Sequence, residues 1–172
     1  MGLFDIFNPP SVPTEPSMPV VSTVLSQKAV SNILQGKIIP IPVKRLALRK
    51  NEDCLFCDYG VMVTEKLKVV GRQRTGGGFF IRIFNGLTYH TGTGGSVNVR
   101  DKVPEYFKGK FYITSNRIIF SSDQKAFQKK KDDLVSYNVE DNCYLILQFT
   151  SGAYKIYLPV AVCAEKVLEK IM

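Results

Sequence analysis

The sequence predicts a mainly β protein, an antiparallel barrel or sandwich with one helix before the strands and one after them. Short apolar runs recur at a spacing of about ten residues and are separated by turn residues. Residues 109–121 read as a tight hairpin, because two runs rich in aromatic and β-branched residues flank a short polar turn. Residues 160–172 have the pattern of an amphipathic helix. The 172 residues, 45% of them hydrophobic, suit one domain.

The N-terminal part divides into an arm and a leading helix. We expect residues 1–21 to be a disordered Pro-rich arm, because five prolines lie between positions 9 and 19. Its first residues are apolar and are interpreted either as a frayed or locally docked end or as a peg for a membrane or partner. The residues of this peg are Leu3, Phe4, Ile6 and Phe7.

Helical spacing predicts a leading helix over residues 22–36. Ser22 or Thr23 is expected to cap its start, and Gly36 lies where a helix C-terminus belongs. Pro40 and Pro42 force the following segment to be extended. Its apolar face holds Leu25, Ala29, Ile33 and Leu34.

Strands fill the remaining domain, residues 37–172, until the closing helix. Gly60 is interpreted as a turn between two strands, and Arg117 in the hairpin as a charge at the rim of the barrel. Beyond the hairpin, strands are expected over residues 46–48, 54–59, 61–70, 79–84, 87–91, 126–130, 134–139, 143–149 and 154–158.

The hairpin text, GKFYITSNRIIFS, resembles the signature hairpin of GRAM domains, which are PH-like modules. The text from about Leu34 to the C-terminus is similar to a group of bacterial PH-like proteins. This resemblance implies a PH-like barrel of about seven or more antiparallel strands, with the C-terminal helix laid across its open end. It implies a binding module and leaves the ligand open, because PH-like barrels carry unrelated binding roles.

Basic residues are concentrated in the middle of the chain. The net charge is +8, and residues 61–131 contain fourteen basic and four acidic residues. This asymmetry suggests an anionic partner, although a basic face can also serve solubility alone. The candidate ligand-binding residues lie in expected loops and hairpin ends and are Arg72, Arg74, Lys108, Lys110, Lys125, Lys129, Lys130 and Lys131.

Catalytic chemistry is not indicated. The four cysteines, at positions 54, 57, 143 and 163, are too few for a disulfide scaffold, and the Cys54–Cys57 pair lacks the second pair of a structural zinc site. They are interpreted as buried thiols. His90 has no evident nucleophile nearby, and the glycine-rich tracts lack a phosphate-loop pattern. We therefore expect no enzyme activity, small-molecule substrate, cofactor or metal.

Three functions follow from these features. The first is an adaptor at an anionic lipid surface, using the basic loops and the peg. The alternative is a protein-interaction module, in which a barrel groove and the C-terminal helix receive a peptide. Nucleic-acid binding is less favoured because no recognised reading motif occurs. A cytoplasmic location, with peripheral membrane association as an option, is expected because no transmembrane or secretory pattern occurs. Homo-oligomerisation is left open.

Overall fold

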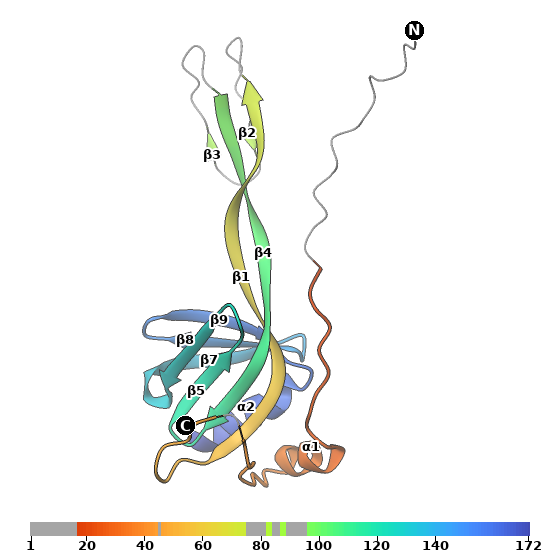
Figure 1. The fold of residues 1–172 in the computed structure, drawn as a ribbon, viewed down its shortest axis with the longest axis vertical. Coiled ribbons are helices and arrows are strands. Elements are labelled where there is room, and N and C mark those ends of the chain that lie inside the picture. The colour runs from red at the N-terminus through yellow and green to blue at the C-terminus, as the bar shows by residue number, and fades with distance from the viewer. Residues whose placement is uncertain (1–16, 45, 75–81, 84–86, 89–95) are drawn as a thin grey trace. The chain divides into compact units, whose positions relative to one another are not determined.

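The computed structural model describes residues 17–44, 46–74, 82–83, 87–88 and 96–172 (Figure 1). Two compact units make up the chain, residues 1–64 with 105–172, and residues 65–104. The long strands β1 (Cys54–Arg74) and β4 (Ser96–Thr114) belong to both units. The second unit also contains a short antiparallel pair, β2 (Arg82–Ile83) and β3 (Leu87–Thr88).

A seven-stranded antiparallel sheet forms the first unit, with the strand order β6-β5-β4-β1-β9-β8-β7. The fold class expected from the sequence is therefore confirmed: about seven antiparallel strands follow one helix and precede another. The remaining elements are α1 (Gln27–Leu34), β5 (Arg117–Ser121), β6 (Ala126–Lys130), the 3-10 helix η1 (Lys131–Asp133), β7 (Leu134–Glu140), β8 (Tyr144–Phe149), β9 (Gly152–Tyr157) and α2 (Ala161–Ile171).

The hydrophobic core lies between the sheet and α2. Helix α2 packs on β7 and β8 and buries Cys163, Ala164, Val167 and Leu168. Phe127 of β6 reaches the opposite strands, because its ring stacks on Tyr154 with centroids 4.1 Å apart. This contact joins β6, at one end of the strand order, to β9 through side chains.

The hairpin predicted from residues 109–121 is present as β4 and β5. Phe111 lies opposite Phe120 and Ile113 opposite Ile118, and all four side chains are fully buried. Gly109 has a packing role, because a Cβ at this position would meet the carbonyl oxygen of Ser121.

Several predicted strand boundaries are wrong. Residues 46–48 form no strand, β1 continues through Gly60, and β4 begins at Ser96, where no strand was expected. Gly60 serves close packing of strands, because a Cβ there would lie 2.9 Å from the Tyr157 carbonyl oxygen in β9. Parts of the strands expected over 79–84 and 87–91 lie outside the described residues.

Helix α1 is shorter than expected, and Ser22 and Thr23 do not cap it. The cap is Ser26, whose hydroxyl accepts a hydrogen bond from the Ala29 amide at 3.2 Å. Ser26 itself has an extended backbone, with φ −68° and ψ 154°, and the preceding Val24 amide donates to the Asp58 carboxylate of β1 at 2.9 Å. The expected end is confirmed, since Gly36 has a φ of +77°. This left-handed conformation lets glycine end a helix while backbone amides bond to the carbonyl groups of the last turn.

Arg117 is buried, so its interpretation as a rim charge is wrong. Its Nε donates to Oε1 of Glu52 at 2.8 Å, and its terminal nitrogen donates to Oε2 at 2.7 Å. The Thr114 hydroxyl donates to Oε1 at 2.6 Å, and the Arg49 amide donates to Oε2 at 2.8 Å. Arg117 also donates to the Ala47 carbonyl at 3.1 Å, which fastens residues 46–48 to the hairpin instead of to a strand.

The first prediction concerns this ion pair. Replacing Glu52 by Gln leaves the buried Arg117 guanidinium without its countercharge, so we expect the free energy of unfolding to fall by about 3–5 kcal/mol. Glu169→Gln is the matched control, because the Lys166–Glu169 pair is exposed and its loss costs less than about 1 kcal/mol. Urea unfolding of both variants measures the difference, and equal losses would contradict the assignment.

The second prediction concerns pH. The hydrogen bonds from Arg117, followed by those from Thr114 and Arg49, hold the pKa of Glu52 at about 2, below its usual 4.5. A lowered folded-state pKa gives stability that is present above pH 4.5 and lost as the pH falls towards 2, amounting to about 3 kcal/mol. Urea unfolding between pH 5 and pH 2 should show this loss in the natural protein and a smaller one in Glu52→Gln. If the free energy of unfolding falls equally in both proteins over this pH range, the role assigned to Glu52 is refuted.

Candidate functional site

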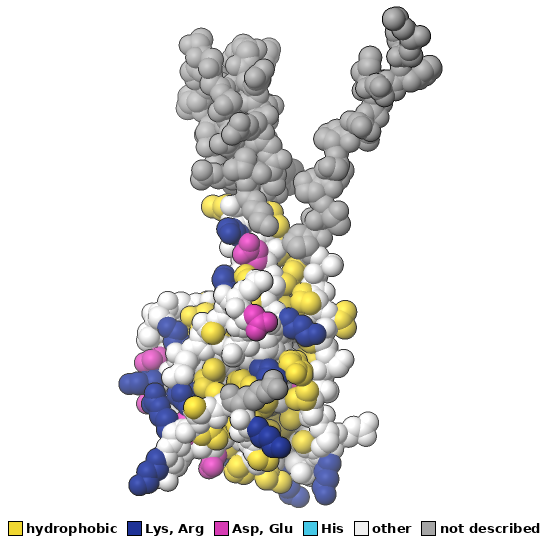
Figure 2. Space-filling model, viewed as in Figure 1, with side chains coloured by type: hydrophobic (Ala, Val, Ile, Leu, Met, Phe, Trp, Pro, Cys, Tyr) yellow, Lys and Arg dark blue, Asp and Glu magenta, His cyan; other side chains and the backbone are white. Residues whose placement is uncertain are grey.

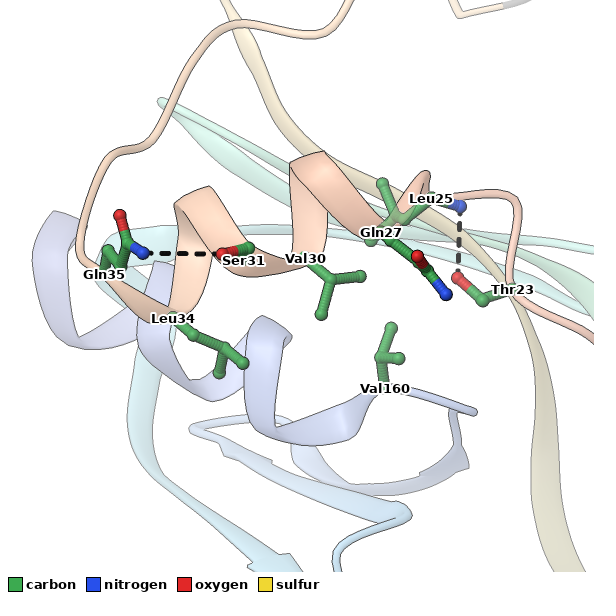
Figure 3. Close-up of a pocket in the computed structure, with 8 residues that line it drawn as sticks. All are labelled: Thr23, Leu25, Gln27, Val30, Ser31, Leu34, Gln35 and Val160. Atoms are coloured by element: carbon green, nitrogen blue, oxygen red, sulfur yellow. Dashed lines mark hydrogen bonds between the residues drawn. The ribbon is translucent and has the colours of Figure 1, made fainter.

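Two cavities adjoin residues 23–25 and share Leu25 as a wall. The first, here called the helix groove, has a volume of about 520 Å³ and lies between α1 and the start of α2 (Figure 3). The second, called the lysine cavity, has a volume of about 310 Å³. The helix groove is lined by Thr23, Leu25, Gln27, Val30, Ser31, Leu34, Gln35 and Val160. The lysine cavity is lined by Val24, Leu25, Ile41, Pro42, Val43, Lys44, Cys57, Lys110 and Tyr112.

The extended segment of residues 17–25, called the strap, separates these cavities and is held by polar contacts. Oδ1 of the fully buried Asp58 accepts from the Val24 amide at 2.9 Å. Lys108 Nζ donates to the Val20 carbonyl at 3.5 Å, and the Tyr144 hydroxyl contacts Met18 Sδ at 3.8 Å. The strap is thus tied to β1, β4 and β8.

Asp58 is a buried carboxylate whose hydrogen bonds are incomplete. Oδ1 also accepts from the Tyr59 amide at 2.9 Å, but Oδ2 has no hydrogen-bond partner of good geometry. Burial raises the pKa of Asp58, and the bond from Val24 and the nearby Thr23 hydroxyl oppose that shift. The carboxylate therefore secures the strap at a cost in desolvation.

The charged side chains that line the lysine cavity are all positive. Lys44 is exposed and Lys110 is half-buried, with Nζ 5.2 Å from the centre of the Tyr59 ring. In the part of the chain that the structure describes, neither ammonium group pairs with a carboxylate. Burial raises the pKa of Cys57, so its thiol remains neutral and adds no negative charge. The cavity therefore favours an anionic group.

The helix groove has different chemistry. Val30 and Leu34 of α1 point towards Val160 at the start of α2 (Figure 3). The polar residues of its wall are uncharged side chains: Thr23, Gln27, Ser31 and Gln35. Such a wall suits an apolar group of a ligand that carries little charge.

Three of the basic residues predicted from the sequence lie near one end of β4. Lys108 binds the strap and Lys110 lines the lysine cavity. Lys125 Nζ lies 4.5 Å from the centre of the Phe107 ring and 3.4 Å from the Thr64 hydroxyl.

The other lysines lie further along β6. Lys130 follows Lys125 by five residues of extended chain, which separates the two positions by about 17 Å. Lys131 Nζ donates to the Ile171 carbonyl at the end of α2, 3.2 Å away, and Lys129 is half-buried. Figure 2 shows Lys and Arg side chains spread over the face in view, with apolar side chains between them. The structure therefore does not bring the predicted lysines into one group.

Some predicted residues cannot be placed in this way. Arg72 and Arg74 belong to β1, but their side chains are outside the described part. His90, the glycine-rich tracts and the N-terminal peg also lie outside the described residues.

Sequence reasoning missed Lys44. It lies in the segment after Pro42, and a chain separation of 66 residues divides it from Lys110. Neither periodicity nor a motif connects these two positions. The sequence around Lys44 is basic and follows two prolines, but this local pattern predicts only an extended segment and not a binding site.

The four cysteines are free thiols. Cys54 and Cys163 are buried as expected, whereas Cys57 and Cys143 are half-buried. Burial raises the pKa of Cys54 to about 12, which keeps it protonated. Among the described residues, no cluster of His, Cys, Asp and Glu could hold a metal ion. Within the same residues, no helix has the length and apolar character needed to cross a membrane.

Comparison with known proteins gives a likeness among solved structures only. No protein-family model matches the chain. No curated protein matches it. Among solved structures, the chain is similar to the Vps36 N-terminal PH domain at 18% identity, with a TM-score of 0.41. The match covers 73% of this chain and 82% of that one. A likeness at this level assigns no ligand, so the function is argued from the residues of the two cavities.

The third prediction concerns the strap. Asp58→Ala removes the acceptor of the Val24 amide, so we expect the hydrogen exchange of this amide to accelerate at least about tenfold. Asp58→Asn keeps a carbonyl oxygen in place and should preserve most of the protection. The Ser115 amide, bonded to the Asp53 carbonyl at 2.9 Å, serves as the control for global unfolding. Unchanged exchange at Val24 in Asp58→Ala would contradict the role of Asp58.

Proposed function

We propose that this protein is a non-catalytic binding module that attaches to an anionic membrane surface through the lysine cavity. The observation that supports it is the pair of ammonium groups, Lys44 and Lys110, that line one cavity without a carboxylate partner in the described residues. Lipid phosphate oxygens would accept hydrogen bonds from both. Lys108 lies two residues from Lys110 on β4 and adds positive charge nearby.

Exposed apolar side chains accompany these lysines. Val20, whose carbonyl binds Lys108, is 87% exposed, and Val24, which lines the cavity, is 56% exposed. Ile39 is 62% exposed and precedes the cavity residue Ile41 by two positions. Basic and apolar groups together are the combination that binds the interface of an anionic bilayer.

The affinity must come from several weak contributions. Each Lys near an anionic membrane contributes about 1 kcal/mol, so Lys44, Lys108 and Lys110 alone give weak attachment. Insertion of the peg residues Leu3, Phe4, Ile6 and Phe7 would add apolar burial. Lys129, Lys130 and Lys131 would add long-range attraction, which salt screens.

The fourth prediction tests this function. Lys44→Gln with Lys110→Gln should weaken binding to vesicles of phosphatidylcholine and phosphatidylserine roughly thirtyfold, because two contributions of about 1 kcal/mol are lost. Lys129→Gln with Lys130→Gln changes the net charge equally and should weaken binding less. Vesicle sedimentation measures both, with phosphatidylcholine vesicles as the baseline.

Two results would overturn the proposal. One is equal binding of the natural protein to both kinds of vesicle. The other is an equal loss in the two double variants, which would show that only net charge matters and that the cavity has no role.

A second candidate function, binding of a partner protein, is favoured by the helix groove. Its apolar wall of Leu25, Val30, Leu34 and Val160 would accept an apolar anchor from a peptide. Leu34→Asp would then abolish saturable binding of a partner recovered from extract, and Lys44→Gln would not. The converse result would assign partner binding to the lysine cavity.

A further inference from the structure

We propose that the N-terminal segment of this chain, residues 3–7, docks into its own helix groove. The groove is the surface and the peg is its occupant. Docking in this way would remove the peg from solution when no membrane is present. The inference concerns a different surface from the lysine cavity, so it does not require the proposed membrane function to be correct.

The groove needs an apolar occupant. Leu34 is 49% exposed although it belongs to the apolar face of α1, and Val30 and Leu34 point towards Val160 across the groove (Figure 3). A volume of about 520 Å³ is enough for several large side chains. The amphipathic helix α1 thus presents apolar side chains that the described chain does not fully cover.

The N-terminal segment matches this wall in chemistry. Four of the five residues 3–7 are large and apolar, and Asp5 is the one charged side chain among them. The groove wall has no charged side chain, so a strongly basic or acidic partner would find no countercharge there. The uncharged Gln27, Ser31 and Gln35 can instead bond to the backbone of a bound segment.

The length of the chain allows the contact within one molecule. Ten residues lead from Phe7 to Ser17, four of them proline, and at 3.1 Å per residue they span about 31 Å. The strap from Ser17 to Thr23, at the groove wall, covers at most about 21 Å. The segment can therefore fold back along the strap and reach the groove. A tether of this length gives an effective concentration in the millimolar range.

The experiment compares the full chain with a chain that lacks residues 1–8. Circular dichroism of the shortened chain verifies that the described strands and helices are retained. A fluorescent peptide with the sequence of residues 1–8 should bind the shortened chain. It should bind the full chain at least about tenfold more weakly, because the groove of the full chain is already occupied. Fluorescence anisotropy measures both.

Matched variants assign the binding to the groove. In the shortened chain, Leu34→Asp should abolish peptide binding, whereas Val135→Asp should not, since Val135 is an exposed apolar residue of β7 away from the groove. A peptide with Ser at positions 3, 4, 6 and 7 should not bind. Circular dichroism of each variant verifies its fold, and the methyl signals of Val30 and Leu34 should shift between the full and the shortened chain.

Three outcomes would overturn the proposal. Equal peptide binding to both chains would show that the groove is open in the full chain. No binding to either chain, with unshifted methyl signals, would show that the segment does not fit the groove. Methyl shifts that depend on protein concentration would assign the occupant to a second copy of this chain. None of these results depends on vesicle binding, so each is distinguishable from failure of the membrane function.

Discussion

The buried ion pair between Glu52 and Arg117 fixes the part of the structure on which the lysine cavity depends. It joins the turn of the β4–β5 hairpin to the loop that precedes β1, and Arg117 also holds the Ala47 carbonyl. The chain just before Ala47 then lies over the outer face of the sheet, where Val43 and Leu46 pack on Tyr112 and Ile119. This packing carries Lys44 to the cavity that Lys110 lines.

Glu52 and Asp58 are both buried carboxylates, but their pKa values shift in opposite directions. Glu52 receives enough hydrogen bonds to remain charged, and its pKa falls. Asp58 receives bonds on one oxygen while the other has none of good geometry, and its pKa rises because desolvation dominates. Glu52, in the loop before β1, thus stabilises the fold, whereas Asp58, in β1, secures an accessory segment. The strap held by Asp58 divides the cationic cavity from the apolar groove, so two surfaces of unlike chemistry lie on either side of Leu25.

Local patterns identified elements whose side chains alternate or repeat regularly. The strand of residues 126–130 was predicted with its observed bounds, and α2 was predicted within one residue at each end. The errors occurred where tertiary contact overrides local preference. Gly60 reads as a turn in the sequence, but lies in a strand because β9 approaches it closely. The sequence suggests Ser22 or Thr23 as the cap of α1, but the Val24 amide is bonded to Asp58, Ser26 stays extended, and the helix begins at Gln27.

The sequence by itself determined the mainly β class, the hairpin of β4 and β5, the two flanking helices and the excess of basic residues. These features depend on spacing within a few residues, which one chain displays directly. Only the tertiary structure decided which charges are buried, which lysines share a cavity and where an apolar groove opens. Lys44 with Lys110, and Glu52 with Arg117, are pairs separated by more than sixty residues. Their proximity follows from strand order and register, which no local pattern records.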